Sequence, residues 1–492
     1  MNNNFVLSEV HALEKQMHIS ANKNEFGTWY SQMYWANDEY LNILSTRRRE
    51  ILAQLQKHGA QFGYNATKMD TRNLSPGCKL CAQGEWSCLF INNKCNASCF
   101  YCPSSQNDLS EPSTQSFVFQ EPISFIAYLE RFGFKGASLS GGEPFLTFDK
   151  TLKFAKAIKN HFGSNLHLWL YTNGILADEH KLNLLAEAGL DEIRFDIGAT
   201  GYNTQKVALA VGRIPTVTVE IPAVDLEKLK CVCKELAHLG VNHLNLHQLR
   251  ATPYNVERII KKDFHFIHGP KVLVAESEII ALECIKYVLD NEISLPVNYC
   301  SFVFKNSHQT KAARLRANEE FLKPHEELTR AGFIRCLYVK AEPEILSALF
   351  TELNEMDSLP KGTVFNYQES SSQLFFNMPL LSILFTKGHD IFLSYSFVHL
   401  RGALSYQNQF KEILLGGKKV FVEKVAVFRN HRIDKILHNL LEKVKIISEE
   451  QNFLDAIMQT SMETNIKDSD YIAMLLRIKE FEYMKQGLQE YY

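Results

Sequence analysis

The run Cys95-Asn-Ala-Ser-Cys99-Phe-Tyr-Cys102-Pro103 directly follows an apolar, strand-like stretch at residues 89–92. It places three thiolates on one tight loop. Iron–sulfur cubanes are held by one thiolate at each iron, so a loop with three cysteines leaves the fourth iron open to a substrate or cofactor. The alternative interpretations are a zinc knuckle or a set of buried thiols, because free cysteine is among the most buried residue types. The clustering favours a [4Fe-4S] site on Cys95, Cys99 and Cys102.

A second motif, Gly141-Gly142-Glu143-Pro144, follows the short apolar stretch at residues 137–140. Glycines let a backbone approach a ligand closely, so this turn is a candidate for receiving part of a cofactor. Taken alone, such a turn is common and carries little functional information. Its position one predicted strand after the cysteine loop indicates that the two motifs share a site.

The Cys-x3-Cys-x-aromatic-Cys spacing, with Tyr101 at the aromatic position, resembles the signature of the radical S-adenosylmethionine (SAM) superfamily. The resemblance implies that the three cysteines hold a [4Fe-4S] cluster and that residues 141–144 and Tyr101 contribute to the SAM site beside it. It also implies that a reductant such as flavodoxin or ferredoxin supplies one electron, so that SAM is cleaved to methionine and a 5′-deoxyadenosyl radical. That radical would abstract hydrogen from a substrate, and the cofactor would carry this chemistry.

From about residue 89 to residue 301, short apolar strands alternate with amphipathic helices. The predicted strands cover residues 89–92, 137–140, 166–171, 192–197, 216–221 and 243–249, and the helices include residues 149–162, 178–188 and 225–239. Such alternation predicts βαβ units and a parallel sheet. The fold class is therefore α/β, and six strands fit the partial (βα)6 barrel that the resemblance implies. A further strand is expected at about residues 295–301.

Polar residues stand at the C-terminal ends of these predicted strands, where barrels of this kind carry their chemistry. Thr172 and Asn173 follow the third strand, Asp196 lies at the end of the fourth and Glu220 at the end of the fifth. Hydroxyl, amide and carboxylate groups suit ribose hydroxyls and an adenine edge, although strand ends are also polar simply because loops are. We predict that all four contact SAM, with Asp196 or Glu220 at the ribose.

Three more cysteines, Cys78, Cys81 and Cys88, precede the loop. A Cys-x2-Cys pair in an intracellular protein commonly marks a metal site. We predict a second metal centre, zinc or iron, with Cys300 as the candidate fourth ligand and His247 as its alternative. Packed thiols that stabilise a turn are the other interpretation.

The Cys-x2-Cys segment before the radical SAM motif, together with runs at residues 220–222, 244–249 and 299–301, resembles one group within the superfamily. That group is largely archaeal and related to pyruvate formate-lyase activating enzymes. The resemblance covers roughly residues 75–330. The run His247-Gln248-Leu249-Arg250 departs from the more acidic sequence expected at that strand end.

At 492 residues the chain exceeds what one hydrophobic core usually supports, so several domains are expected. Apolar periodicity at residues 29–58 indicates an amphipathic helix. We predict an N-terminal helical segment over 1–74, the radical SAM barrel with its preceding cysteine segment over 75–330, and a C-terminal α+β domain with a helical tail over 331–492.

The composition, 46% hydrophobic and 22% charged, is that of an ordinary globular protein, and the net charge of −2 argues against a strongly basic surface for nucleic acid. The sequence shows neither a secretory signal nor an apolar stretch long enough to span a bilayer, so we expect no membrane association. The eleven cysteines are best explained as metal ligands and core thiols in a reducing compartment. These features predict a cytoplasmic protein.

Together these features predict a radical SAM enzyme, an iron–sulfur oxidoreductase. The large C-terminal domain and the N-terminal segment favour a peptide or protein substrate, because a small molecule would need only the barrel. Two alternatives stay open: a radical SAM enzyme that acts on RNA or a small molecule, and a metal-binding structural or regulatory protein without radical chemistry. The second accounts for the cysteines but not for residues 141–143 or the polar strand ends.

Overall fold

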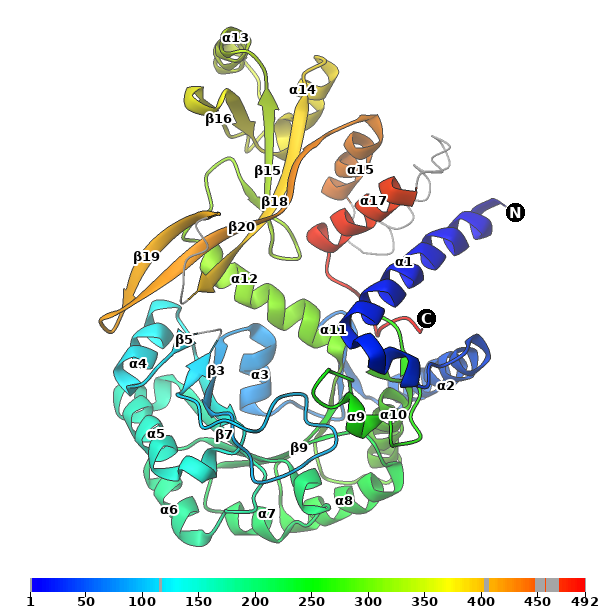
Figure 1. The fold of residues 1–492 in the computed structure, drawn as a ribbon, viewed down its shortest axis with the longest axis vertical. Helices are drawn as coiled ribbons and strands as arrows, with labels where there is room; N and C mark the ends of the chain where they lie inside the picture. The colour runs from blue at the N-terminus through cyan, green and yellow to red at the C-terminus, as the bar shows by residue number, and fades with distance from the viewer. Residues whose placement is uncertain (1, 115–116, 402–406, 447–455, 457–468, 492) are drawn as a thin grey trace. The chain divides into compact units, whose positions relative to one another are not determined.

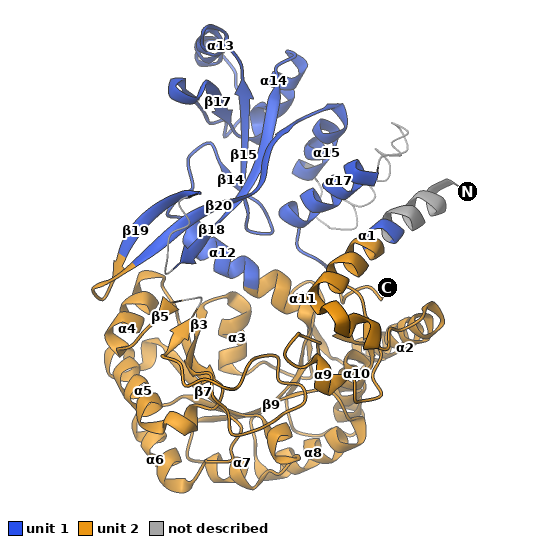
Figure 2. Cartoon of the chain, in the orientation of Figure 1, with its two compact units in different colours: residues 1–14, 310–413, 420–486 blue, residues 15–309, 414–419, 487–492 orange. Residues whose placement is uncertain are grey.

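The computed structural model describes residues 2–114, 117–401, 407–446, 456 and 469–491 (Figure 1). The chain divides into two compact units (Figure 2). The barrel unit comprises residues 15–309, 414–419 and 487–492, and the α+β unit comprises residues 1–14, 310–413 and 420–486. The domain boundaries expected from the sequence, after residues 74 and 330, differ from this division and stay predictions.

The barrel unit is built on seven parallel strands in the order β13-β10-β9-β8-β7-β6-β3. Their bounds are β3 Trp86–Asn92, β6 Gly136–Gly141, β7 His167–Thr172, β8 Glu192–Phe195, β9 Thr216–Pro222, β10 His243–His247 and β13 Val297–Cys300. Antiparallel strands β2 (Lys68–Asp70) and β4 (Ser113–Thr114) pair with β13 and β3. The outermost parallel strands therefore do not pair with each other, which confirms the α/β fold with a partial barrel.

Six helices follow the strands around the outside of the barrel (Figure 1). They are α4 Pro122–Arg131, α5 Phe148–Phe162, α6 Glu179–Glu187, α7 Gln205–Ala210, α8 Leu226–Leu239 and α10 Ala275–Asp290. Capping explains why two of them begin where they do. The Asp178 side chain accepts a hydrogen bond from the Lys181 backbone N at the start of α6, and Asp225 accepts one from Lys228 at the start of α8.

The N-terminal part differs from the single helix predicted over residues 29–58. Helix α1 covers Asn2–Phe26, residues 27–32 form a 3-10 helix, and α2 covers Asp38–Lys57. Helix α2 begins only after Asn37, because the Asn37 side chain caps it by accepting a hydrogen bond of 2.8 Å from the Tyr40 backbone N. Two further elements follow: the hairpin of β1 (Gln61–Gly63) and β2, and helix α3 (Pro76–Gln83).

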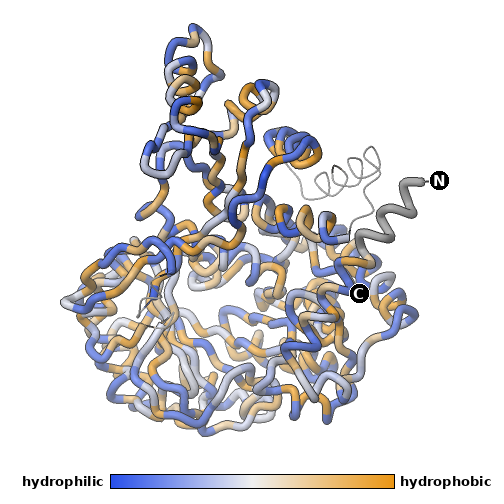
Figure 3. The backbone as a smooth tube through the Cα atoms, turned by 45° about the horizontal axis from the view of Figure 1, so that its top comes forward, coloured by the Kyte–Doolittle hydropathy of each residue, from blue (hydrophilic) through white to orange (hydrophobic). Residues whose placement is uncertain are grey.

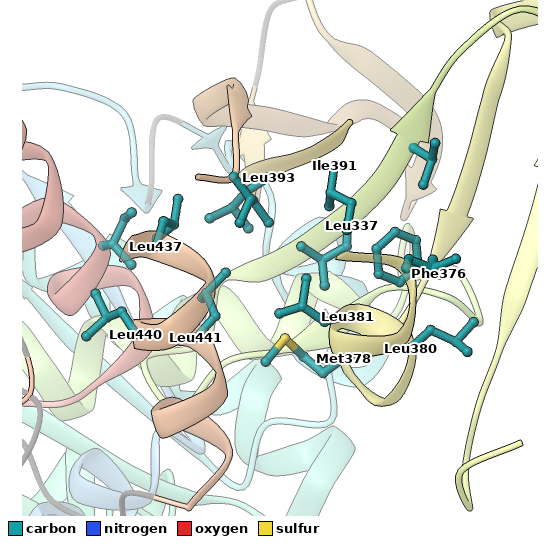
Figure 4. Packing of buried hydrophobic residues seen from close by; sticks show 14 of the residues in the cluster. Leu337, Phe376, Met378, Leu380, Leu381, Ile391, Leu393, Leu437, Leu440 and Leu441 are labelled. Atoms are coloured by element: carbon teal, nitrogen blue, oxygen red, sulfur yellow. The ribbon is translucent and has the colours of Figure 1, made fainter. Parts of the chain in front are cut away.

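The α+β unit contains an antiparallel sheet in the order β16-β17-β15-β18-β20-β19. Its strands are β15 Ile334–Lys340, β16 Phe365–Gln368, β17 Gln373–Phe376, β18 Ile391–Arg401, β19 Gln409–Leu415 and β20 Lys418–Arg432. Helices α12 (Thr310–Asn318), α13 (Pro343–Glu355), α14 (Leu381–Thr386), α15 (Lys435–Ile446) and α17 (Ser469–Glu482) belong to the same unit. Leu337, Leu381, Leu393 and Leu441 join sheet and helices in one buried core (Figure 4).

Part of the predicted helical tail, residues 447–455 and 457–468, lies outside the described residues. Hydrophobic residues are dispersed in short stretches among hydrophilic ones (Figure 3). Among the helices that the structure describes, none is long and apolar enough to cross a lipid bilayer.

Candidate active site

A cavity of about 360 Å³ lies at the C-terminal ends of the parallel strands of the barrel unit. That volume falls within the range of small-molecule sites. The predicted site residues that line it are Cys95, Cys99, Tyr101, Cys102, Gly141, Gly142, Thr172, Asn173, Asp196 and Glu220. Glu143, Pro144 and the four cysteines of the predicted second centre are not among its lining residues. The fold thus brings the cysteine loop and the ends of β6, β7, β8 and β9 to one cavity.

Backbone and amide donors surround the sulfur of Cys95. The Ala97 backbone N donates to Cys95 Sγ at 3.4 Å, and Asn173 Nδ2 lies 3.6 Å from the same atom. Such donors stabilise a thiolate and orient it toward a metal. Burial raises the pKa of Cys95, and it raises the pKa of Cys99 to about 12, so binding of iron would displace protons from these thiols.

The arrangement of the three loop sulfur atoms bears on the choice between a cluster and a zinc knuckle. Sulfurs on one tetrahedral zinc ion lie roughly 4 Å apart, given a Zn–S bond of about 2.3 Å. In the part of the chain that the structure describes, the only trio of ligand atoms within 4.8 Å of one another belongs to His325, Glu326 and Cys336 of the α+β unit. The three loop sulfurs do not form such a trio in the described structure, so their arrangement gives no support to a single zinc ion.

The two glycines hold the cysteine loop against the end of β6. Gly142 N donates to Asn92 O and Glu143 N donates to Lys94 O, both at 2.8 Å. A Cβ atom on Gly141 would lie 2.1 Å from Asn92 O, and one on Gly142 would lie 2.0 Å from Lys94 O. Glycine is thus required because the backbone of the loop packs here, in addition to the close approach of a ligand that the sequence suggested.

The carboxylate of Glu143 faces the protein interior. Its oxygens accept hydrogen bonds from the backbone N of Phe145 at 2.9 Å, the hydroxyl of Thr172 at 2.9 Å and the backbone N of Asn173 at 2.7 Å. The side chain is 1% exposed, and burial raises its pKa to about 7. Glu143 therefore joins the end of β6 to the end of β7, and its side chain does not face the cavity.

Asp196 is held in place at the cavity wall. Tyr101 Oη donates to Asp196 Oδ1 at 2.7 Å, and Gly198 N donates to the same oxygen at 3.1 Å. Burial raises the pKa of Asp196 to about 6 and raises the pKa of Tyr101 far above its usual value. Among the described residues, none donates a hydrogen bond to Asp196 Oδ2, so that oxygen is available to a ligand.

A charged network that the sequence did not predict supports the same wall. Arg194, on β8, is 3% exposed; its Nε lies 2.8 Å from Glu192 and its Nη1 lies 2.8 Å from Glu220. His247 Nε2 lies 2.5 Å from Glu220 Oε1, and Lys305 Nζ lies 2.9 Å from His247 Nδ1. Although burial opposes its charge, His247 and Arg194 hold the pKa of Glu220 well below its usual range.

The alternation of side chains along a strand could have predicted part of this network from the sequence. Residues two apart in a strand share a face, so Glu192 and Arg194 lie on the same face as Asp196. Charged residues at two consecutive inward positions of a buried strand must pair with groups on neighbouring strands. The identity of those partners depends on strand order, which a single sequence does not provide.

The cysteines of the predicted second centre do not line the cavity, but Cys300 hydrogen-bonds with His247, the alternative ligand, which does. Cys78 and Cys81 lie one turn apart on α3, and Cys300 ends β13. Lys68 lies close to all three: burial opposes its charge, but these thiols raise its pKa. Burial also opposes ionisation of Cys300, yet Lys68 and Lys305 lower its pKa to about 6. The Lys68 ammonium group is a cation close to the thiols of Cys78, Cys81 and Cys300. In the described structure, these three sulfur atoms do not form a trio spaced for one metal ion.

Cys88 lies on β3. The hydroxyls of Ser138 and Ser140 hydrogen-bond with its thiol, while burial raises its pKa to about 11. Its assignment to a second centre stays a prediction.

A family model described as the radical SAM superfamily matches residues 89–207. A candidate glycyl-radical enzyme activating enzyme of Methanocaldococcus jannaschii is 31% identical over 279 residues, which cover 53% of this chain and 72% of that protein. The chain belongs to the radical SAM superfamily. It is therefore an enzyme, and its relationship to activating enzymes agrees with the group expected from its motifs.

Two further proteins resemble this radical SAM enzyme over a shorter part of the chain or at a lower sequence identity. A candidate GTP 3′,8-cyclase of Methanocaldococcus jannaschii is 31% identical over 128 residues, which cover 26% of this chain and 41% of that protein. The crystal structure of Streptococcus suis SuiB bound to S-adenosylmethionine is 11% identical, with a TM-score of 0.35, and covers 56% of this chain and 58% of SuiB. A similarity this low carries no further argument.

The superfamily implies a [4Fe-4S] cluster and SAM, and the residues present fit both groups. Cys95, Cys99 and Cys102 all line the cavity. The cavity continues from these thiols along four strand ends to Asp196 and Glu220. A cavity with thiols at one part and hydrogen-bond acceptors at another suits a nucleoside cofactor that must reach a cluster.

Proposed function

We propose that Cys95, Cys99 and Cys102 hold the [4Fe-4S] cluster and that SAM binds along the ends of β6, β7 and β8. The observation that carries the proposal is that one cavity is lined by all three thiols, by Gly141 and Gly142, and by the polar strand ends. When bound, the cluster and SAM supply one-electron cleavage of SAM and a carbon radical that abstracts hydrogen from a substrate. The protein residues bind and orient these groups and keep water away from them.

Asp196 is the better candidate for the ribose hydroxyls. Both carboxylate oxygens of Glu220 are already engaged, by Arg194 and Asn245 on one side and by His247 on the other. Asp196 keeps Oδ2 available, while Tyr101 and Gly198 fix the direction of its carboxylate. A carboxylate oriented in this way accepts hydrogen bonds from a diol without first rearranging. We therefore assign the ribose to Asp196 and a supporting role to Glu220.

Two neighbouring side chains position the cofactor end of the site. Asn173 Nδ2 bridges Cys95 Sγ and Asn96 Oδ1, the latter at 2.7 Å, and so orients the first cluster ligand. Thr172 receives a hydrogen bond from Gly174 N at 3.0 Å and donates to Glu143, which fixes the end of β7. Gly141 and Gly142 present backbone, rather than side chains, to the methionine end of SAM.

We infer that the substrate is a peptide or protein. The relative from Methanocaldococcus jannaschii is named for activating an enzyme, which supports a protein target for this chain. The α+β unit, with its own hydrophobic core, provides a second folded body beyond the barrel that a small-molecule substrate would not require. A flavodoxin or ferredoxin would supply the electron. The cytoplasmic location and a second metal at Cys78, Cys81, Cys88 and Cys300 stay predictions.

Isotope transfer tests the substrate proposal. The reconstituted enzyme would be incubated anaerobically with SAM, a reductant and deuterated candidate proteins encoded next to its gene. We expect one candidate to raise the formation of 5′-deoxyadenosine, to transfer deuterium into it and to change in mass. Deuterium transfer from a small molecule instead, with none from any protein, would overturn the assignment to a protein substrate.

Metal analysis of the same preparation tests the second centre. Metal beyond about four irons per chain that is lost in Cys300→Ala and kept in Cys231→Ala would support it. Cys231 is a suitable control because it is exposed on α8. Equal metal content in wild type and Cys300→Ala would leave these cysteines as packed thiols around Lys68.

A further inference from the structure

Arg250 presents a cationic group to the cavity beyond the sixth parallel strand. It lies three residues after the end of β10 and lines the cavity together with Phe302 and Lys305. The Arg250 guanidinium carbon is 5.3 Å from the centroid of the Phe302 ring, and Lys305 Nζ is 5.0 Å from the same centroid. Two cationic side chains therefore flank one aromatic ring on the cavity wall.

The other charges near this wall are balanced within the protein. Arg194 pairs with Glu192 and Glu220, and Lys305 is tied through His247 to Glu220. The Asp196 carboxylate is held by Tyr101 and Gly198. Of the two arginines that line the cavity, Arg194 therefore has carboxylate partners, whereas Arg250 has none among the described residues.

Arg250 makes no ion pair and no side-chain hydrogen bond with any residue that the structure describes; its contact is with the Phe302 ring. Burial lowers the pKa of Arg250, and the charge of Glu25 offsets that effect only in part. A partly buried guanidinium without a paired carboxylate has lost some of its hydration, and an anionic ligand would offset that cost. This position in the cavity indicates that a ligand supplies a counter-charge.

SAM does not provide that counter-charge in the arrangement proposed above. The amino-acid end of SAM lies at Gly141 and Gly142, on β6, whereas Arg250 follows β10. Four strand intervals separate β6 from β10 in the sheet, although both strand ends line one cavity. The arrangement above assigns the SAM carboxylate to β6 and so leaves the anion at Arg250 to another molecule; the Kd for SAM in Arg250→Gln distinguishes the two.

We propose that Arg250, with Lys305 and Phe302 beside it, binds an anionic group, a carboxylate or a phosphate, of the substrate. The proposal rests on the proposed function, because it assigns the part of the cavity that SAM leaves free to the substrate. A planar guanidinium offers paired donors that match a carboxylate or a phosphate. The Phe302 ring adds an apolar surface next to the charge. The departure of residues 247–250 from an acidic sequence has its explanation in this binding site.

Thermal unfolding in the presence of probe anions tests the site without turnover. The reconstituted enzyme with SAM would be titrated with N-acetylglutamate, with inorganic phosphate and with neutral N-acetylglutamine. We expect the midpoint of unfolding of the wild type to rise with at least one anion and not with N-acetylglutamine, because a ligand that binds the folded state stabilises it. The anion that acts identifies the group as a carboxylate or a phosphate.

Two variants assign the effect to Arg250. Arg250→Gln should weaken the apparent affinity for the anion at least about tenfold, Arg250→Lys should weaken it less, and both should keep the wild-type Kd for SAM. Arg49→Gln, an exposed position on α2, is the matched control. An anion response in Arg250→Gln equal to that of the wild type, no response in the wild type, or a parallel loss of SAM binding would each overturn the proposal. A failure of SAM cleavage alone would instead contradict the proposed function.

Discussion

The two glycines at the end of β6 connect the cysteine loop to the sheet at the scale of single residues. The sequence indicated that they allow a ligand to approach, and the structure adds a second reason, which is contact with the loop backbone. The loop carrying Cys95 leaves β3 through Asn92 and Lys94, and the carbonyl oxygens of both meet the glycine backbone. Any side chain at this point would move the loop and the first cluster ligand with it.

We therefore expect Gly142→Ala to prevent the enzyme from holding its cluster. The new Cβ would lie 2.0 Å from Lys94 O, a backbone atom that can only yield if the loop shifts. We expect iron content to fall well below about four per chain and the formation of 5′-deoxyadenosine to fall at least about tenfold. Gly63→Ala is the control, because a Cβ there meets nothing within 4 Å. Full iron content in Gly142→Ala would show that the loop tolerates the displacement.

Asp196→Asn should weaken SAM binding without removing the cluster. The substitution keeps the size of the side chain and removes the charge that makes its hydrogen bonds to a diol strong. We expect the Kd for SAM, measured by equilibrium dialysis, to rise about tenfold while iron content stays unchanged. Asp149→Asn, exposed in the first turn of α5, is the control. Unchanged SAM affinity in Asp196→Asn would contradict the assignment of the ribose to Asp196 and would indicate another strand end.

At the scale of secondary-structure elements, Glu192 joins α3 to three strands of the barrel. Its carboxylate binds Arg194, accepts a hydrogen bond from Thr218 at 2.9 Å, contacts His167 at 3.1 Å and accepts one from Gly77 N at 3.0 Å. The side chain is fully buried, and although burial opposes its charge, Arg194 and His167 lower its pKa to about 2. An ionised Glu192 is thus part of the folded state.

We expect the ionisation of Glu192 to make the free energy of unfolding depend on pH. Because its folded pKa lies below the ordinary value of 4.5, its contribution is present above about pH 4.5 and is lost as pH falls toward about 2. We expect the free energy of unfolding of the wild type to exceed that of Glu192→Gln by about 3 kcal/mol at pH 6, and the difference to shrink below pH 4.5. Urea unfolding measures both. Glu187→Gln, exposed on α6, should show no such difference.

The same scale shows which parts of the fold the sequence could predict. The apolar runs at residues 166–171 and 216–221 predicted two strands, β7 and β9, to within one residue, because buried parallel strands have few other interpretations. The hairpin of β1 and β2 was missed because its strands are three residues long and take their stability from pairing with β13. Helix α3 was missed because Cys78 and Cys81 were interpreted as metal ligands or as thiols packed at a turn.

The candidate active site also has a part that the sequence predicts and a part that it does not. Cysteine spacing and the glycine motif are local, so they identified the cofactor end of the cavity. The pairing of Arg194 with Glu192 and Glu220 depends on which strands are neighbours, and the open carboxylate oxygen of Asp196 depends on its hydrogen bonds. A single sequence contains neither, which is why Asp196 and Glu220 could not be distinguished before the structure.

At the scale of the barrel unit as a whole, segments far apart in the chain meet around Glu278. Arg48 of α2 binds Glu278 of α10 at 2.9 Å, and Tyr491 Oη donates to the same carboxylate at 2.7 Å. The Arg48 guanidinium also lies 4.0 Å from the Tyr491 ring centroid. Glu278 is fully buried, so its charge depends on these partners.

Arg48→Ala should destabilise the barrel unit by about 3 to 5 kcal/mol, because it leaves a buried carboxylate without its cation. Thermal unfolding measures the effect, and adding Glu278→Gln to Arg48→Ala should restore part of the loss. Arg49→Ala, next to Arg48 but exposed, should change stability by less than about 0.5 kcal/mol. Equal stability of Arg48→Ala and the wild type would show that water replaces the arginine at Glu278.

The most direct test of the central claim measures 5′-deoxyadenosine after anaerobic reconstitution with iron and sulfide, reduction with dithionite and addition of SAM. We predict about four irons per chain, the absorption of a [4Fe-4S] cluster and formation of 5′-deoxyadenosine by the wild type, with product absent from Cys99→Ala. A fully reconstituted wild type that forms no 5′-deoxyadenosine, with or without candidate substrates, would contradict the assignment of this cavity to radical SAM chemistry.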